Sequence, residues 1–212
     1  MSDITPYLAG IFAAYAILLV AASSPGPAVA LLIGIATAQG RTPALVATLG
    51  ISLGSVTINI LTMLGVGFIL SQAAWAVSLL RFMCALYLLY LAYGAFKRAM
   101  NSASLEPIEP RFQSTAKQFL AGYLLQVTNP KAISFWIAIA SIGAVEGAAF
   151  PIVLLYLSGA FLISFVCHGA WAFALSMSSV RRGYARSRRW VEATLGGLFT
   201  FFAYRLATAE SV

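Results

Sequence analysis

Two proline interruptions constrain the fold of this chain more than any other feature. Ser24-Pro25-Gly26-Pro27 and Asn129-Pro130-Lys131 each break a long apolar run near its middle, one in each half of the 212 residues. Proline lacks a backbone N–H and clashes with the carbonyl four residues back, so it interrupts a helix. Lipid cannot satisfy the freed backbone groups, so such breaks must face protein or a wet cavity. Paired breaks in two halves of a chain indicate the binding site of a transporter.

The composition excludes an ordinary soluble domain. Hydrophobic residues make up 61% of the chain and charged residues only 9%, whereas soluble domains carry about 25% charged residues. The net charge of +7 arises from Lys and Arg in short connections between apolar runs, which is a signal of membrane topology. We therefore expect membrane lipid and no nucleic acid as a partner. Cys84 and Cys167 show no metal-ligand spacing, and neither a metal nor a cofactor is expected.

Six apolar segments are long enough to cross a membrane, which requires about 20 helical residues. They run approximately over residues 7–39, 42–70, 75–96, 117–144, 151–177 and 191–208. We therefore expect an all-α membrane protein with six transmembrane helices, of which the first and fourth are interrupted. The polar stretch near the middle divides the chain into a first three-helix repeat (1–99), a cytoplasmic linker (100–114) and a second three-helix repeat (115–212).

The basic residues predict the orientation. Most of the 13 Lys and Arg residues flank the first, third and fifth connections: Arg41, Lys97, Arg98, Arg111, Lys117, Arg181, Arg182, Arg186, Arg188 and Arg189. Basic connections stay in the cytoplasm, so both termini are expected to be periplasmic. Because each half has three spans, the second half must enter the membrane from the opposite face. The two halves are therefore expected to form an inverted repeat.

Lys131 is the only basic residue deep within a predicted span. Burying its ammonium costs about 2.5–3.5 kcal/mol even on lenient insertion scales, so a compensating group is required. One interpretation is that Lys131 faces a water-filled site and pairs with an anionic group of the substrate. The alternative is that it snorkels to an interface or bonds to carbonyls freed by Pro130. Its distance from both ends of the span favours the first interpretation.

Small polar residues and free backbone surround both breaks. A half-helix that begins after each break points free N–H groups and a partial positive charge toward it, where a carboxylate is stabilised. Carbonyls before the prolines suit an ammonium, and an α-amino acid carries both charges. The alternative is that the polar side chains only satisfy the kinked backbone. The expected substrate-binding residues are Ser24, Pro25, Gly26, Pro27, Thr128, Asn129, Pro130 and Lys131.

Three further polar residues are candidates for the cavity or for proton coupling. Ser55 and Asn59 follow one another on the second span, and His168 in the fifth span is the sole histidine. An intramembrane histidine either relays protons or is hydrogen-bonded within the bundle, and both interpretations remain open. Glu146 falls in a short connection and Glu192 at the entry of the last span. No carboxylate is therefore expected in the middle of a span.

The motifs together resemble those of the LysE/RhtB family of bacterial amino-acid exporters. The matching residues, in order along the chain, are Ser24-Pro25-Gly26-Pro27, Gly50-xxx-Gly54, Tyr87-Leu88-Leu89-Tyr90-Leu91 with Gly94, and Gln126-Val127-Thr128-Asn129-Pro130-Lys131-Ala132. The resemblance implies a six-span permease of the inner membrane that exports amino acids or related metabolites, driven by the proton motive force. The two glycines of the second motif also predict close helix packing.

Two departures from the family pattern bear on the substrate. Many relatives carry an acidic residue at the position of Ser55 and another near His168, and their loss favours a neutral or less basic substrate. We expect a secondary exporter of a small amino acid or related zwitterionic metabolite in the bacterial inner membrane, and not an enzyme. Proton coupling and a homodimer are left open. The alternatives are an intramembrane enzyme that pairs Ser23 or Ser24 with His168, and a passive channel.

Overall fold

The computed structural model describes residues 3–72, 74–100, 114–174 and 176–208. The secondary-structure elements of these residues are all helices, without strands. The elements, in chain order, are η1 (Thr5–Tyr7), α1 (Leu8–Ser23), α2 (Pro27–Ala38), α3 (Arg41–Gln72), α4 (Ala74–Met100), α5 (Thr115–Val127), α6 (Pro130–Ala140), α7 (Phe150–Ala174) and α8 (Ser178–Ala207).

Both predicted helix breaks are confirmed. The first apolar run divides into α1 and α2, and the fourth into α5 and α6. Each second half begins with proline, Pro27 in α2 and Pro130 in α6. The first helical position has no intrahelical partner for its N–H, so proline costs little there and its fixed φ suits the helix. The prolines therefore restart the helices after each break.

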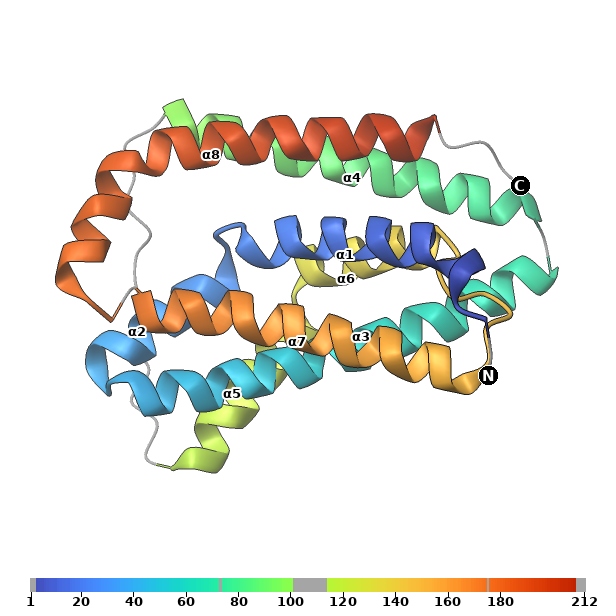
Figure 1. Ribbon diagram of the computed structural model, residues 1–212. Coiled ribbons are helices and arrows are strands. Elements are labelled where there is room, and N and C mark those ends of the chain that lie inside the picture. Colours follow the sequence, from blue (N-terminus) through green and yellow to red (C-terminus); the bar gives the residue numbers. More distant parts are fainter. Residues whose placement is uncertain (1–2, 73, 101–113, 175, 209–212) are drawn as a thin grey trace.

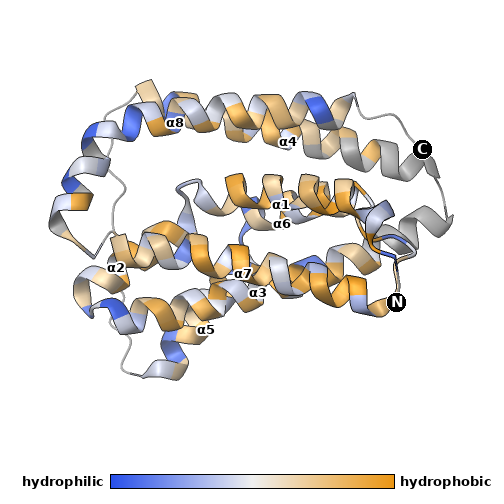
Figure 2. Ribbon diagram, in the orientation of Figure 1, coloured by the Kyte–Doolittle hydropathy of each residue, from blue (hydrophilic) through white to orange (hydrophobic). Residues whose placement is uncertain are grey.

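Several helices have the apolar character of membrane spans. Thr5–Ser23, Arg41–Gly65 and Phe150–Ala174 are long and apolar enough to cross a membrane, and Pro27–Ala38 and Pro130–Ala140 are shorter apolar helices. The apolar residues colour most of α1, α6 and α7 in Figure 2, whereas hydrophilic residues gather in the first part of α8. The last helix begins at Ser178 rather than near residue 191. The arginine-rich segment before residue 191 is therefore helical.

Successive crossings of the bundle alternate in direction, with α1 and α2 forming one crossing and α5 and α6 another (Figure 1). Helices α4 and α8 lie together along one side, α1 and α6 lie in the middle, and α3, α5 and α7 lie on the other side. Phe135 of α6 packs against Phe199 of α8 with ring centroids 5.5 Å apart. Helices α1 and α6, one half of each interrupted helix, therefore lie between the two outer layers.

Glycines allow α3 and α5 to approach closely, as predicted for the small-residue motif of the second span. A Cβ on Gly50 would lie 2.0 Å from the carbonyl oxygen of Phe119. A Cβ on Gly122 would lie 2.1 Å from the carbonyl oxygen of Ala47. Only the absence of both side chains permits this distance between the backbones. The close contact brings the end of α5, next to the second break, against the polar residues of α3.

Candidate functional site

The two breaks meet in space through Lys131. Its ammonium Nζ donates to the carbonyl oxygen of Ser24 at 2.9 Å and also to the Ser24 hydroxyl. A Cβ on Gly26 would lie 3.3 Å from the same nitrogen, so the ammonium lies over the glycine of the first break. Residues more than 100 positions apart in sequence thus converge on one point. The sequence predicted both breaks as parts of one site, and the structure brings them together.

Lys131 therefore bonds to backbone freed at the first break rather than at its own. The Ser24 hydroxyl donates to the carbonyl of Ala21 at 2.8 Å and accepts from the ammonium. Among the residues that the structure describes, Lys131 has no carboxylate within ion-pair distance. An ammonium has three N–H donors and Ser24 accepts two of them. One donor and the uncompensated charge are left for a further partner.

The N-termini beyond the two breaks differ in their capping. Helix α2 starts from Gly26, which has extended backbone and no side chain to cap the first turn. Helix α6 starts from Asn129, whose side-chain oxygen accepts from the backbone N–H of Lys131 at 3.1 Å. The first N–H groups of a helix have no intrahelical acceptor and carry a partial positive charge. The uncapped start of α2 is therefore the better place for an anion.

A cavity lies where the breaks meet, with a volume of about 30 Å³. A water molecule needs roughly 10–15 Å³ by this measure. The space accommodates about two waters and is too tight for an amino acid, so the site must widen to admit a substrate. The polar or backbone-exposing residues that line it are Ser24, Gly26, Pro27, Ser55, Gln126, Asn129, Lys131 and His168, with Phe135 and Trp136 among its apolar lining.

Ser55 connects three helices at one wall of the cavity. Its hydroxyl oxygen accepts from Gln126 Nε2 at 3.2 Å and from Trp136 Nε1 at 3.0 Å. A hydroxyl has two lone pairs and one proton to donate. Both lone pairs are used by α5 and α6, so the proton of the Ser55 hydroxyl is available to the cavity. The serine can thus supply a neutral donor opposite the charged Lys131.

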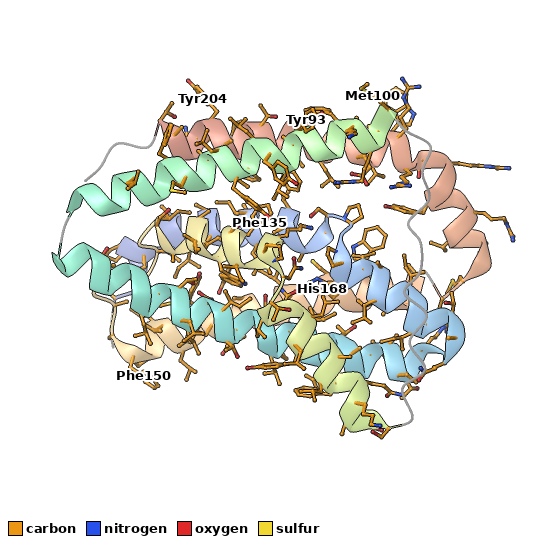
Figure 3. All side chains as sticks on the ribbon, turned by 180° about the vertical axis from the view of Figure 1, so that it is seen from behind. Tyr93, Met100, Phe135, Phe150, His168 and Tyr204 are labelled. Atoms are coloured by element: carbon orange, nitrogen blue, oxygen red, sulfur yellow. The ribbon has the colours of Figure 1, made fainter. Side chains whose placement is uncertain are left out.

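His168 lies in the centre of the bundle, as Figure 3 shows, and lines the same cavity. Its Nδ1 is 2.8 Å from the carbonyl oxygen of Ser164, one turn earlier on α7. A carbonyl oxygen only accepts, so Nδ1 carries the proton and the other ring nitrogen, Nε2, is left as an acceptor when the ring is neutral. This tautomer allows His168 to take a proton from the cavity side.

Some predicted site residues lie apart from the cavity. Thr128 is exposed, and its hydroxyl donates to the carbonyl of Leu124 at 2.7 Å. Pro25 and Pro130 shape the breaks without lining the cavity. Asn59 lies one turn beyond Ser55 and is fully buried. Its amide makes no close hydrogen bond in the described part of the chain, although the Tyr156 hydroxyl lies near enough to interact with it.

Sequence reasoning missed three residues of this region. Gln126 stands in the family motif and Trp136 resembled an ordinary span residue, and only the packing of α5 and α6 on α3 shows that both donate to Ser55. Glu192, expected at a membrane entry, lies midway along α8 and is fully buried, which the sequence did not predict. Its spacing of four residues from Arg188, typical of a helical ion pair, was the available signal for the ion pair.

Comparison with known proteins supports the motif resemblance. The profile of the family described as LysE type translocator matches residues 19–210. The chain is 30% identical over 198 residues to a threonine efflux protein of Salmonella typhi, covering 89% of this chain and 92% of the relative. It is 27% identical over 194 residues to the threonine efflux protein of Escherichia coli K12, with the same coverage.

A further relative is an uncharacterized membrane protein of Escherichia coli K12, 25% identical over 183 residues that cover 86% of this chain and 82% of the relative. No solved structure matches significantly. Since the family profile extends over most of the sequence and the threonine efflux proteins align nearly end to end, the chain belongs to the family of LysE type translocators.

Proposed function

We propose that this protein is a secondary transporter that exports a small neutral amino acid, such as threonine, across the bacterial inner membrane. One observation carries the proposal: the Lys131 ammonium reaches across to Ser24, beside the uncapped N-terminus of α2 and within a cavity. A fixed cation and a helix N-terminus together stabilise a carboxylate. The names of the threonine efflux relatives support an amino acid of this kind.

The substrate-binding residues of this proposal are those around the two breaks. The carboxylate binds at Lys131 and the first turn of α2, next to Gly26 and Pro27. The ammonium of the substrate binds at carbonyls before the breaks. Pro25 and Pro130 keep these carbonyls out of helical hydrogen bonds. Asn129 and Thr128 hold the second break in shape.

The polar wall of the cavity suits a neutral side chain. The Ser55 hydroxyl can donate and the Gln126 carbonyl oxygen can accept, which together match a hydroxyl on the substrate. Asn59 lies one turn further along α3 and adds a polar side chain beyond this wall.

We also propose six spans arranged as two inverted three-helix repeats, residues 1–99 and 115–212 joined by a cytoplasmic linker at 100–114, with both termini periplasmic. Helix α3 packs on α5 and α6, and α7 packs on α1 and α2, which is the same relation with the two halves exchanged. Glycines support it: Gly54 contacts α5, and Gly159 contacts α1. A reporter fused after Val212 is expected outside the cytoplasm, and one inserted near Pro107 inside.

Proton coupling is proposed through His168, because its Nε2 is available on the cavity side. An intramembrane enzyme has less support. Ser23 has its hydroxyl 3.8 Å from Cys167 Sγ, and Ser24 uses its proton on the carbonyl of Ala21. A serine nucleophile needs a base within hydrogen-bond reach, and the hydrogen bonds of the described residues give neither serine such a contact with His168.

The test is export of preloaded radiolabelled threonine from cells that lack their own threonine exporters, with and without this protein. Faster release that a protonophore abolishes supports a proton-driven exporter. Release that persists without a proton gradient and does not saturate would identify a passive channel. If neither threonine nor another neutral amino acid is released faster, the proposal is wrong.

A further inference from the structure

A second polar cluster surrounds Glu192, outside the cavity at the breaks. Glu192 is fully buried. Its Oε1 lies 3.1 Å from Arg98 Nε at the end of α4 and 3.9 Å from Arg188 Nε one turn earlier on α8. Both arginines thus face the same carboxylate oxygen. The cluster carries one net positive charge around a buried carboxylate, and the Arg98 side chain is 42% exposed.

Several atoms of this cluster have no partner. Within the described residues, Glu192 Oε2, Arg188 Nε and Nη1, and the Tyr184 hydroxyl are buried without a hydrogen bond. Buried polar atoms are almost always satisfied in proteins, and each orphan is costly. If these ion pairs only joined α4 to α8, the polar groups would be expected to form hydrogen bonds with one another. The unpaired atoms are N–H donors of the Arg188 guanidinium, the Tyr184 hydroxyl and an acceptor oxygen of the Glu192 carboxylate.

The cluster adjoins the site at the breaks. The ring of Tyr184 meets Trp171 edge-on at 5.3 Å between centroids, and Trp171 Nε1 donates to the carbonyl of Ser23 at 3.2 Å. Arg98 and Glu192 are also the charged groups that act electrostatically on Lys131. The cluster lies next to the arginine-rich start of α8, which is cytoplasmic in the proposed orientation. An exported substrate enters from that side.

We infer that this cluster is a second amino-acid-binding site, which receives the zwitterion from the cytoplasm before it reaches the cavity at the breaks. The carboxylate of the substrate binds the Arg188 guanidinium and the Tyr184 hydroxyl, and its ammonium binds Glu192 Oε2. Guanidinium groups suit carboxylates in buried places because they are planar and weakly hydrated. The inference rests on the proposed function, since it supplies the entry step for the same substrate.

The experiment is uptake of radiolabelled threonine into inside-out membrane vesicles, measured over a range of concentrations and normalised to protein in the membrane. Arg188→Gln removes the carboxylate partner but leaves Glu192 paired with Arg98. We expect the half-saturating threonine concentration to rise about tenfold while the maximal rate stays within about twofold. The matched control is Arg189→Gln, because Arg189 is exposed. It should leave both values unchanged.

Tyr184→Phe provides a second, less disruptive variant, because it removes one hydroxyl and no charge. It should raise the half-saturating concentration about threefold to tenfold, as expected for the loss of one typical hydrogen bond. A maximal rate that falls with unchanged half-saturation in both variants would mean a structural ion pair and overturn the inference. Identical curves for Arg188→Gln, Tyr184→Phe and Arg189→Gln would also overturn it, while the proposed function would stand. Parent vesicles that accumulate no neutral amino acid would refute both.

Discussion

The two helix breaks look alike in sequence but differ in structure. Both restart a helix at proline. At the second break, Asn129 caps the new helix with its own side chain and leaves little backbone unsatisfied. At the first break, Gly26 offers no cap, and the freed carbonyl of Ser24 is satisfied by Lys131 from the other half of the chain. The second break is capped by its own residue, whereas the first depends on Lys131 from the other half of the chain.

In the proposed function, this difference gives the two breaks separate roles. The second break places Lys131, whereas the first acts as a receptor for the substrate, with an open helix N-terminus and an approachable backbone. Glycine at position 26 favours this arrangement, since its missing Cβ leaves room for the ammonium without a shift of the lysine. The backbone of Gly26 is extended, with φ at −177°, so the preference for glycine arises from space rather than from backbone strain.

The largest expected effect comes from removing the residue that joins the breaks. Lys131→Ala should lower threonine export by about 10- to 100-fold, because a hydrogen bond to a charged group contributes about 1.5–3 kcal/mol. Lys131→Arg should also export poorly, since its planar fork differs from a compact ammonium beside Ser24. Efflux from preloaded cells, normalised to membrane protein, measures both.

Lys97→Ala is the control for the loss of a positive charge. Lys97 lies in the last turn of α4, where a charge near the interface has water as a partner, and export should not change. A Lys131→Ala protein that exports like the parent would show that the lysine only stabilises the first break. The anion-binding role would then be withdrawn.

Closing the first break should have the next largest effect. Replacing both Pro25 and Pro27 with Ala restores two N–H donors and lets α1 continue into α2, which would hide the carbonyl of Ser24 and the free N-terminus. Export should fall about tenfold or more with insertion retained, as expected when a charged ligand loses its backbone donors.

Pro43→Ala is the matched control, because Pro43 lies in the first turn of α3. A backbone N–H restored there has no intrahelical acceptor, so the helix should not change. Its export should equal that of the parent. If the double variant at the first break also exports normally, the two breaks are equivalent packing kinks, and the receptor role of the first break is wrong.

The local features of the site could be predicted from the sequence because they depend on local chemistry. A proline interrupts its own helix whatever surrounds it, and an ammonium in an apolar run needs a partner wherever it lies. The sequence therefore predicted both breaks and that Lys131 needs a partner. It did not specify that the partner is Ser24 of the other half, because that pairing depends on how α1 and α6 pack.

Residues whose role depends on packing could not be predicted. Gln126 belongs to the family motif and Trp136 has no local signature, and the hydrogen bonds of both residues to Ser55 could not be predicted. The burial of Glu192 was missed for a different reason. Hydropathy treats the arginine-rich segment before it as a connection, whereas the structure continues the helix through that segment from Ser178. Charged residues at a helix start are compatible with helix propensity even where they exclude a membrane span.

Removing the cap of the second break should affect stability more than transport. Asn129→Ala loses the bond to the Lys131 backbone N–H, which costs about 1 kcal/mol and lowers the melting temperature by about 2–4 °C. Export should fall only about twofold to threefold, as a slight displacement of Lys131 predicts. Asn129→Asp keeps an acceptor and should restore stability. Abolished export with unchanged stability would place Asn129 in contact with the substrate and remove the distinction between the breaks.

A further small effect tests the space above Gly26. In Gly26→Ala the new methyl group would lie 3.3 Å from Lys131 Nζ and 3.5 Å from its Cδ, so the flexible end of the lysine must shift by a few tenths of an ångström. Export should fall about twofold to fivefold, corresponding to roughly 0.5–1 kcal/mol. Gly197→Ala is the control, because no heavy atom lies within 4 Å of a Cβ there.

The same substitution distinguishes crowding of the lysine from a direct effect on the substrate. Two residues that act through one contact are not additive. In a Lys131→Ala background, Gly26→Ala should therefore reduce the residual export no further, because the atom it displaces is gone. A full twofold to fivefold loss in that background as well would mean that position 26 touches the substrate itself. The first break would then bind its ligand independently of the lysine from the second.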